Sequence, residues 1–430
     1  FRCNFDTIEW FSFFENCAKI GKLVVNPNIR FRLQKLGKEN TGSVLNRSMF
    51  RITKMQFLNQ ETVPVLSHQL LKEFLVPKQA KSMSPYSFAF CEKLNKITFD
   101  DGNKINLIPE FCFSSSSLTE IAIPSSVESI DKYAFYQCYN LEKVHLLRGN
   151  KLNTIQEGAF CECKKLESIH ISKSVEKIGK FAFMSCTSLQ KVSFSENCKL
   201  KAIDEYAFNE CKKLSSISLP DTVEFIGKDC FSYTGLKSIQ VPPLIKSIET
   251  RTFYNCEYLS KVELFEGLES IGSFSFSKDL SLKVIQIPDS VRSISSNAFF
   301  DCINLRKLKT TTNTQLVELF EGIIENTKIE ELTINRSARI LFTPRKVDRL
   351  KRINFSGGSP EYFIQKKDGC IYEKTTEFDH FEGTELERLL ESEIDEPNKL
   401  YHFIEEDYFN RIGRNTNFKF KKLNEIEKLY

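Results

Sequence analysis

The sequence is poor in the residue types on which most catalytic and metal sites depend. Its 430 residues include five His, one Trp, four Met and 17 Gly. It contains no glycine-rich phosphate loop, no Gly-x-Ser-x-Gly elbow and no His-Glu-x-x-His pair. With so few His there is little material for a nucleophile and its base. We therefore expect the chain not to be an enzyme and to need no cofactor.

An excess of one charge and long apolar runs are also missing. The chain has 60 Lys and Arg against 56 Asp and Glu, a formal net charge of +4. A general nucleic-acid binder would be strongly basic, so we expect no nucleic-acid partner. No apolar run approaches the ~18 residues that a membrane-spanning helix requires. We expect no membrane span within this chain, and nothing in the composition indicates an oligomeric state.

Phenylalanine and cysteine are abundant instead, with 38 Phe and 14 Cys. Both recur in one pattern that repeats every 22 to 25 residues between residues 83 and 310. Degenerate copies, which keep the spacing but lose some of the repeated residues, flank this stretch, as is usual at the ends of a repeat array. One complete copy reads Ile130, Ala134, Phe135, Cys138, Leu141, Val144 and Leu146.

One copy of the repeat predicts one coil of a solenoid. Val144 and Leu146 point inward from a short strand, and Lys143 and His145 point outward, because side chains alternate along a strand. We predict a single helical turn at residues 134–138, where the small alanine allows a neighbouring coil to approach. No coil can bury its apolar side alone, so coils must stack. The predicted fold class is an α/β solenoid of short parallel strands and helical turns.

The frame Ile-x-x-x-Ala-Phe-x-x-Cys-x-x-Leu-x-x-Ile-x-Ile-Pro-x-Ser-Val resembles the leucine-rich repeat of the BspA-like type. Eight near-perfect copies carry the resemblance, which covers roughly residues 61–360 with a fragment at 8–27. Residues 359–372 resemble that family's hairpin, in which an aromatic strand, an Asp-Gly turn and an Ile-Tyr strand follow one another. The resemblance implies a leucine-rich-repeat fold and a protein-binding role.

We predict four segments along the chain, which begins at Phe1 and is expected to be trimmed. Residues 1–27 form an N-terminal repeat fragment, 28–60 an irregular insertion, with degenerate turns as the alternative, and 61–375 the solenoid. Residues 376–430 form a charged helical segment, because Thr384-x-x-Glu387 is a capping-box start for an amphipathic helix. This segment is expected to cap the last coil, and an interaction tail is the alternative.

Cysteines are the strongest candidates for special chemistry in the repeat. Eight of them share one repeat position, and we predict a column of buried free thiols, because parallel side chains disfavour disulfide geometry. Disulfides among the off-register cysteines remain open. The column comprises Cys17, Cys91, Cys138, Cys163, Cys186, Cys211, Cys256 and Cys302, and the off-register cysteines are Cys3, Cys112, Cys161, Cys198, Cys230 and Cys370.

A metal site is the less favoured interpretation of the remaining ligands. Cys161-x-Cys163 is the one close couple, whereas a zinc finger needs two knuckles. His145 and His170 occupy the same outward position in consecutive coils, and they would suit a metal or a pH-sensitive pair. No third ligand is near them in sequence, so we favour solvent-facing histidines and expect no metal.

The outward positions of the strands form the candidate binding surface. We expect them to lie on the concave face that curved solenoids present to partners, and a merely solvated sheet face is the alternative. The surface is polar and mildly basic. The candidate residues are Lys96, Lys143, His145, His170, Lys191, Ser193, Ser218, Gln240, Lys261, Glu263, Gln286 and Lys307.

Two functions remain open at this stage. The resemblance implies a non-catalytic protein-binding module, because members of the family are often surface antigens and some of them bind host matrix proteins or mediate adhesion. The expected partner is then a host or extracellular-matrix protein, and the expected location is the cell surface or the secreted fraction. The alternative is an intracellular leucine-rich-repeat scaffold whose thiols stay reduced in the cytoplasm.

Overall fold

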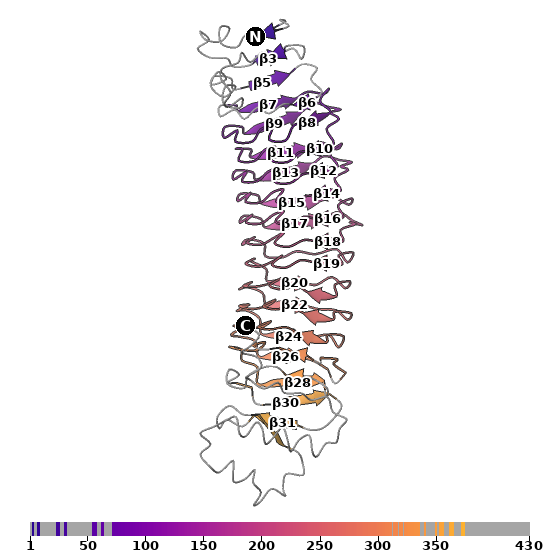
Figure 1. Ribbon diagram of the computed structural model, residues 1–430, viewed down its shortest axis with the longest axis vertical. Coiled ribbons are helices and arrows are strands. Elements are labelled where there is room, and N and C mark those ends of the chain that lie inside the picture. Colours follow the sequence, from indigo (N-terminus) through magenta and orange to yellow (C-terminus); the bar gives the residue numbers. More distant parts are fainter. Residues whose placement is uncertain are drawn as a thin grey trace, which may run out of the picture. The chain divides into compact units, whose positions relative to one another are not determined.

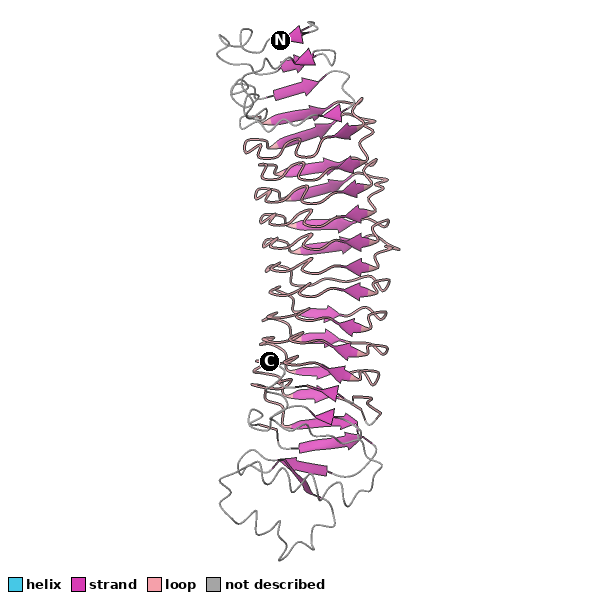
Figure 2. Ribbon diagram, in the orientation of Figure 1, coloured by secondary structure: helices cyan, strands magenta, loops and turns pink. Residues whose placement is uncertain are grey.

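The computed structural model describes residues 71–311, 313–316, 318–320 and 322–335, together with a few short segments outside these ranges. The chain divides into two compact units. Unit 1 is Phe1–Leu236 and unit 2 is Lys237–Tyr430. In each unit, short strands follow one another in successive coils, and the coils pair through parallel sheets (Figures 1 and 2).

Unit 1 carries two sets of parallel strands. The long-strand sheets run in the order β1-β3-β5-β7-β9 and β11-β13-β15-β17. Neighbours are consecutive coils, so Glu120 of β11 pairs with Lys143 of β13. Their bounds are β1 (Arg2–Cys3), β3 (Leu23–Val25), β5 (Lys54–Phe57), β7 (Glu73–Val76), β9 (Lys96–Phe99), β11 (Glu120–Ile123), β13 (Lys143–Leu146), β15 (Ser168–Ile171) and β17 (Lys191–Phe194).

The second set in unit 1 consists of two-residue strands. They form sheets in the order β2-β4, β6-β8 and β10-β12-β14-β16-β18-β19. Their bounds are β2 (Thr7–Ile8), β4 (Arg30–Phe31), β6 (Thr62–Val63), β8 (Ser82–Met83), β10 (Leu107–Ile108), β12 (Ser129–Ile130), β14 (Thr154–Ile155), β16 (Lys177–Ile178), β18 (Ala202–Ile203) and β19 (Phe225–Ile226).

Unit 2 repeats the arrangement with shorter sheets. Its sheets run in the order β20-β22, β24-β26, β28-β30-β31-β32 and β21-β23-β25-β27-β29. The long strands are β20 (Ser238–Gln240), β22 (Lys261–Glu263), β24 (Val284–Gln286), β26 (Lys307–Lys309), β28 (Glu331–Asn335), β30 (Arg352–Ser356), β31 (Glu361–Ile364) and β32 (Ile371–Lys374). The two-residue strands are β21 (Ser247–Ile248), β23 (Ser270–Ile271), β25 (Ser293–Ile294), β27 (Glu318–Leu319) and β29 (Arg339–Ile340).

The alternation that the sequence predicts is confirmed in the long strands whose burial the structure describes, except that the inward residues Phe99, Leu146 and Phe194 are only half-buried. In β13 Val144 is buried, whereas Lys143 and His145 are exposed. The same pattern holds in β15, where Ile169 and Ile171 are buried. One predicted strand does not form, because residues 216–219 have no regular ladder although Ile217 is buried. Alternation therefore sets the inner and outer sides of the coil even where the strand is lost.

Phenylalanine fills the interior once per coil. In unit 1, the rings from Phe88 to Phe231 stack with centroids 5.0 to 5.5 Å apart. In unit 2, Phe276 stacks on Phe253 and Phe299 at 5.3 and 5.4 Å. Each of these side chains is fully buried. Burying one Phe contributes roughly 1.5–3 kcal/mol, and ring contacts add about 0.5–1.5 kcal/mol. The phenylalanine surplus is thus the core of the repeat.

The predicted helical turns are wrong, since the described residues contain no helix. Residues 131–138 form consecutive tight turns, and Tyr133 and Gln137 have φ of 54° and 57°. A right-handed helix cannot contain these left-handed residues. Alternate N–H groups also leave the coil: Phe135 donates to Ala159 O at 2.8 Å, and Gln137 donates to Cys161 O at 2.9 Å. The backbone therefore bonds to the next coil where a helix would bond to itself.

The same pair of left-handed residues, four positions apart, recurs in about 11 coils of the two units. At Gly158, a β carbon would collide with the ring of Tyr133 in the preceding coil. Glycine is required there because the outer aromatic ring lies directly on its backbone. The turns of successive coils are thus joined by backbone hydrogen bonds, as the strands of the two sets are.

Cysteine in the repeat is both core and hydrogen-bond donor. All eleven described cysteines are free and buried. The Cys138, Cys163 and Cys186 thiols donate to the carbonyl oxygens of Phe113, Phe135 and Phe160 at 3.0 to 3.1 Å. The buried free-thiol column is thus confirmed for its described members. Cys17, and Cys3 and Cys370 of the off-register set, lie outside the described residues.

The C-terminal predictions have separate outcomes. β31 and β32 pair in antiparallel fashion, and Tyr362 lies opposite Glu373. The strand pair of the predicted hairpin is therefore confirmed, while its Asp-Gly turn lies outside the described residues. The predicted helical segment at 376–430 also lies outside them. In the described part of the chain, no helix has the length and apolar character to cross a membrane.

Candidate functional site

We define the long-strand face as the outward side chains of the long strands, described for each unit separately. Eleven of the twelve candidate residues from the sequence lie at such positions, and Ser218 lies in a stretch without a ladder. Ten of the candidates are exposed, and Ser193 and Glu263 are half-buried. The exposed ones are Lys96, Lys143, His145, His170, Lys191, Ser218, Gln240, Lys261, Gln286 and Lys307.

In unit 1, the strand register brings several candidates side by side. Lys143 pairs with Ser168, and Ser168 pairs with Lys191 in the next coil. His170 pairs with Ser193. Neighbouring strands lie ~4.8 Å apart, so Lys143 and Lys191 flank Ser168 with their Cα atoms about 10 Å apart. The face therefore carries two cations separated by one small hydroxyl.

The two outward histidines contact other residues rather than one shared ligand. His170 bonds through Nδ1 to Ser193 Oγ at 3.0 Å and through Nε2 to Ser195 Oγ at 2.9 Å. His145 Nε2 lies 3.7 Å from Glu120 Oε2. Ser195 was not among the candidates, because it follows β17 and the alternation of the strand does not reach it. Among the described residues, no group of three or more potential ligands could hold a metal ion.

In unit 2, the candidates form a shorter row. Gln240 pairs with Glu263 across β20 and β22, and Lys261 forms an ion pair with Glu263 on the same strand. Lys307 pairs in register with Val284. Exposed pairs of this kind stabilise a fold by about 0–1 kcal/mol, so these charges are free to meet a partner at little cost.

Aromatic residues also line the outer edge of the turns, which the repeat frame did not predict. In unit 1, Phe111 stacks between Tyr86 and Tyr133 at 5.1 Å from each. The Tyr133 hydroxyl donates to Glu157 Oε1 at 2.8 Å. Burial, the bond to Glu157 and its charge raise the pKa of Tyr133 to about 12. The Tyr133 phenol is therefore uncharged at neutral pH. The sequence signal for this row is an aromatic residue two positions before the core phenylalanine in these coils, at Tyr86, Phe111 and Tyr133.

Three of the buried thiols, Cys161, Cys186 and Cys230, are unsuited to nucleophilic chemistry. Burial, followed by the charge of Glu162, raises the pKa of Cys161 to about 12. Burial also raises the pKa values of Cys186 and Cys230 well above the ordinary range. A thiol reacts as its thiolate, so these groups are inert at neutral pH. Their contacts assign them to packing and to bonds between coils.

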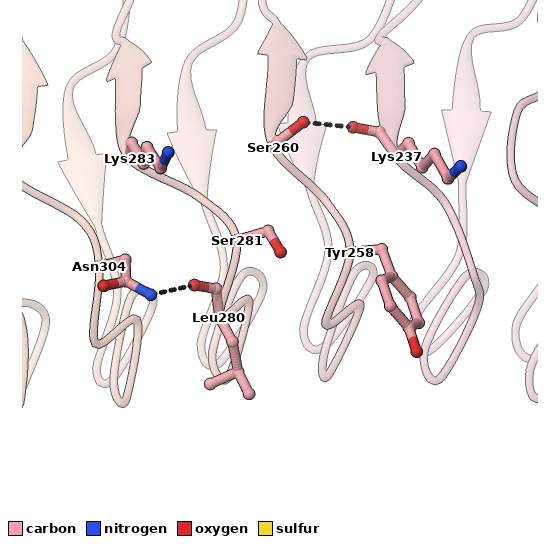
Figure 3. A pocket seen from close by; sticks show the side chains of 7 residues that line it. All are labelled: Lys237, Tyr258, Ser260, Leu280, Ser281, Lys283 and Asn304. Carbon is pink, nitrogen blue, oxygen red and sulfur yellow. Dashed lines mark hydrogen bonds between the residues drawn. The ribbon is translucent and has the colours of Figure 1, made fainter.

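A cavity of about 430 Å³ opens in unit 2, beside the long strands. Its lining is Lys237, Tyr258, Ser260, Leu280, Ser281, Lys283 and Asn304 (Figure 3). None of these was a candidate, because each falls between the strand positions and the turn positions of the repeat. A hollow at this place depends on side-chain size in three consecutive coils, which no single repeat reveals.

Comparison with known proteins gives one family. The family described as BspA type Leucine rich repeat region (6 copies) matches residues 65–151, 148–258 and 224–342. No curated protein matches the chain.

Several solved structures resemble the chain at low identity. A leucine-rich repeat protein from Bacteroides ovatus is 22% identical over 62% of this chain and 79% of its own, with a TM-score of 0.45. The pneumococcal vaccine antigen PcpA is 20% identical over 71% and 92%, with a TM-score of 0.35. A leucine rich cell surface protein from Faecalibacterium prausnitzii is 17% identical over 71% and 88%, with a TM-score of 0.35.

Proposed function

Because the chain belongs to the BspA type leucine-rich repeat family, we propose that it is a non-catalytic module that binds a protein through its long-strand face. Proteins with leucine-rich repeats commonly bind other proteins through an extended sheet surface. The proposal includes exposure at a cell surface and a role in adhesion or host-protein recognition. The partner is then a host or extracellular-matrix protein.

The exposure of the long-strand face carries the proposal. Inward residues such as Val144 and Ile169 form the core, while Lys143, His170 and Lys191 on the same strands are exposed. Their side chains therefore contribute little to packing. A regular row of exposed polar groups on a rigid scaffold suits recognition, because the scaffold holds them in place without an ordering cost on binding.

Charge reversal on this face tests the proposal. The variant combines Lys143→Glu, Lys191→Glu and Lys261→Glu, and its binding to immobilised extracellular-matrix proteins is measured by biolayer interferometry. We expect about a tenfold or greater loss of affinity, because each reversal sets a like charge against a partner that suits a lysine. Circular dichroism should not change and the melting temperature should fall only slightly, because the three side chains are exposed and the lost Lys261–Glu263 pair contributes about 0–1 kcal/mol.

A matched control reverses three exposed lysines away from the strands, at Lys151, Lys173 and Lys199. It changes net charge equally, so it should bind as the wild type does. Equal binding by wild type, face variant and control would remove the long-strand face from recognition and leave a solvated sheet. Equal loss in both variants would show attraction by net charge alone.

An intracellular scaffold for protein–protein interaction is the second candidate. The free, buried state of all eleven described cysteines favours it, because reduced thiols are usual in the cytoplasm. Mass spectrometry of the protein isolated from its source separates the two. Glycans on the sequons at Asn46, Asn335 or Asn354 would exclude an exclusively cytoplasmic protein.

A further inference from the structure

The cavity in unit 2 spans consecutive coils and has two chemically different sides. Lys237 and Lys283 lie on one side, with Ser260 between them, and Tyr258 and Leu280 extend on the other (Figure 3). The Tyr258 side chain is 61% exposed. The cavity has a volume of about 430 Å³, which falls within the range of ligand sites. The hollow thus combines a cationic side with an apolar one.

The sequence of three coils produces the hollow. Lys237, Ser260 and Lys283 are the residues directly before β20, β22 and β24. Because coils stack at ~4.8 Å, the two lysine Cα atoms are about 10 Å apart, with a small serine between them. Ser260 Oγ donates to Lys237 O at 3.1 Å, so its side chain lies back against the preceding coil. The space between the lysines stays open.

Most fixed polar groups of the lining are already bonded within the protein. Ser281 Oγ donates to Glu257 O at 2.7 Å. Asn304 Nδ2 donates to Leu280 O at 2.9 Å, and Asn304 Oδ1 accepts from Lys328 Nζ at 2.9 Å. Few oriented groups therefore remain to grip the hydroxyls of a neutral sugar.

Two ammonium groups, one phenol and an apolar surface remain for a ligand. Neither Lys237 nor Lys283 has an ion-pair partner among the residues that the structure describes. The residue before β26 is also basic, Arg306, whereas the corresponding residues before β13 and β15 in unit 1 are Glu142 and Glu167. In unit 1 the residue before β7 is also basic, Lys72, so this edge carries three basic residues in unit 2 and a single described one in unit 1.

We propose that this cavity binds an acidic, extended segment of a partner protein. Carboxylates of the segment bind Lys237 and Lys283, and an apolar side chain between them packs on Tyr258 and Leu280. An extended chain rises ~3.3 Å per residue, so about three residues span the distance between the lysines. The inference deepens the proposed function and rests on it, because the cavity adjoins the long-strand face of unit 2.

A direct binding measurement tests the inference. The probe is a short fluorescein-labelled peptide in which glutamate alternates with leucine and phenylalanine, titrated with the full chain by fluorescence anisotropy. Lys237→Ala combined with Lys283→Ala should weaken binding about tenfold, since two solvent-accessible charge pairs contribute about 1–2 kcal/mol together. The same peptide with glutamine in place of glutamate should bind the wild-type protein with an affinity about tenfold lower.

Two controls separate the cavity from net charge and from the long-strand face. Lys173→Ala with Lys199→Ala removes two exposed lysines of unit 1 and should leave peptide affinity within about twofold of wild type. Lys143→Glu with Lys191→Glu should also leave it unchanged, even where that variant loses matrix binding. Failure of the proposed function and failure of the cavity are then distinguishable.

Two outcomes would overturn the inference. One is equal peptide affinity for the wild type and the cavity variant. The other is tight binding of heparin that depends on Lys237 and Lys283 while the acidic peptide fails to bind, which would make the ligand a sulfated polysaccharide. The melting temperature of the cavity variant should match that of wild type, because both lysines are exposed.

Discussion

Asp279 occupies a repeat position that other coils of the solenoid fill with cysteine. It lies three residues after Phe276, as Cys302 lies three after Phe299, and it is fully buried. Its Oδ1 accepts the Cys256 N–H at 2.8 Å, but its Oδ2 has no partner among the described residues. Burial raises the pKa of Asp279 well above its usual range, and the bond from Cys256 opposes this only in part. The coil therefore carries a carboxyl group that folding prefers to keep protonated.

Asp279→Cys is expected to stabilise the protein at neutral pH. When folding raises the pKa of a carboxyl, its contribution to the free energy of unfolding is fully present below the unfolded pKa of ~3.9. This contribution is lost as the pH rises toward the folded pKa. Replacement by the repeat's own cysteine removes that loss. We expect the free energy of unfolding to rise by about 1–3 kcal/mol at neutral pH, the cost of a buried unpaired polar group. Urea denaturation at several pH values measures it.

The gain should shrink as the pH falls and vanish well below ~3.9, where the wild-type carboxyl is protonated in both the folded and the unfolded state. Asp221→Asn, at an exposed position, serves as the control and should change stability by about 0.5 kcal/mol or less at every pH. A pH-independent difference between Asp279→Cys and wild type would mean that Asp279 does not titrate with folding. Its effect would then be one of packing alone.

At the scale of the element, the strands were predictable from the sequence and the turns were not. Alternation at Lys143, Val144 and His145 depends only on the geometry of one strand, so the local pattern was sufficient. The turn at Ala134–Cys138 has helical spacing in the sequence. Its hydrogen bonds nevertheless go to the next coil, as Phe135 N–H to Ala159 O does. A single-repeat pattern carries no information about partners in a neighbouring repeat.

Phe90 provides a test of the turn conformation. It has φ of 59° and is 61% exposed, so little packing is lost when its side chain is removed. We expect Phe90→Gly to be more stable than Phe90→Ala by about 1 kcal/mol. The left-handed conformation is unfavourable for residues with a β carbon, and glycine has none. In a helical turn the order would be reversed by about the same amount. Guanidinium denaturation of both variants gives the sign.

The matched control is the same pair of substitutions at Lys213, which is exposed and does not have a positive φ. There glycine should be less stable than alanine by about 0.5–1 kcal/mol. Were alanine also the more stable residue at position 90, the turn would be helical in solution. The predicted helical turn would then be restored.

At the scale of the whole molecule, the sequence predicted the stacked coils and the long-strand face, because both follow from a repeat of 22 to 25 residues. The cavity could not be predicted from the repeat. Lys237, Ser260 and Lys283 hold the same position in three coils, and their difference in size creates the hollow. The carbonyl acceptors of the thiols were also missed, since Cys186 bonds to Phe160 of another coil. Properties that follow from repetition of one coil were readable, whereas hydrogen bonds and hollows that depend on the side chains of neighbouring coils were not.

Stacking therefore makes thiol reactivity a property of the whole molecule. Of 14 cysteines in the sequence, eleven are described and all are buried and free, so at most three (14 − 11) should react rapidly in the native protein. Burial raises the pKa of Cys161 to about 12, which leaves almost no thiolate at neutral pH. Maleimide labelling followed by peptide mass spectrometry identifies the modified sites.

In denaturant all 14 cysteines should react, and those of one unit should become reactive over the same range of urea concentration. This expectation follows because each coil has its core and its backbone bonds in common with its neighbours, so opening one coil exposes the next. Rapid native labelling of Cys163 or Cys186, or a disulfide between members of the column, would contradict it. Either result would mean that single coils open independently, and the thiols would then be sites of redox chemistry rather than parts of the core.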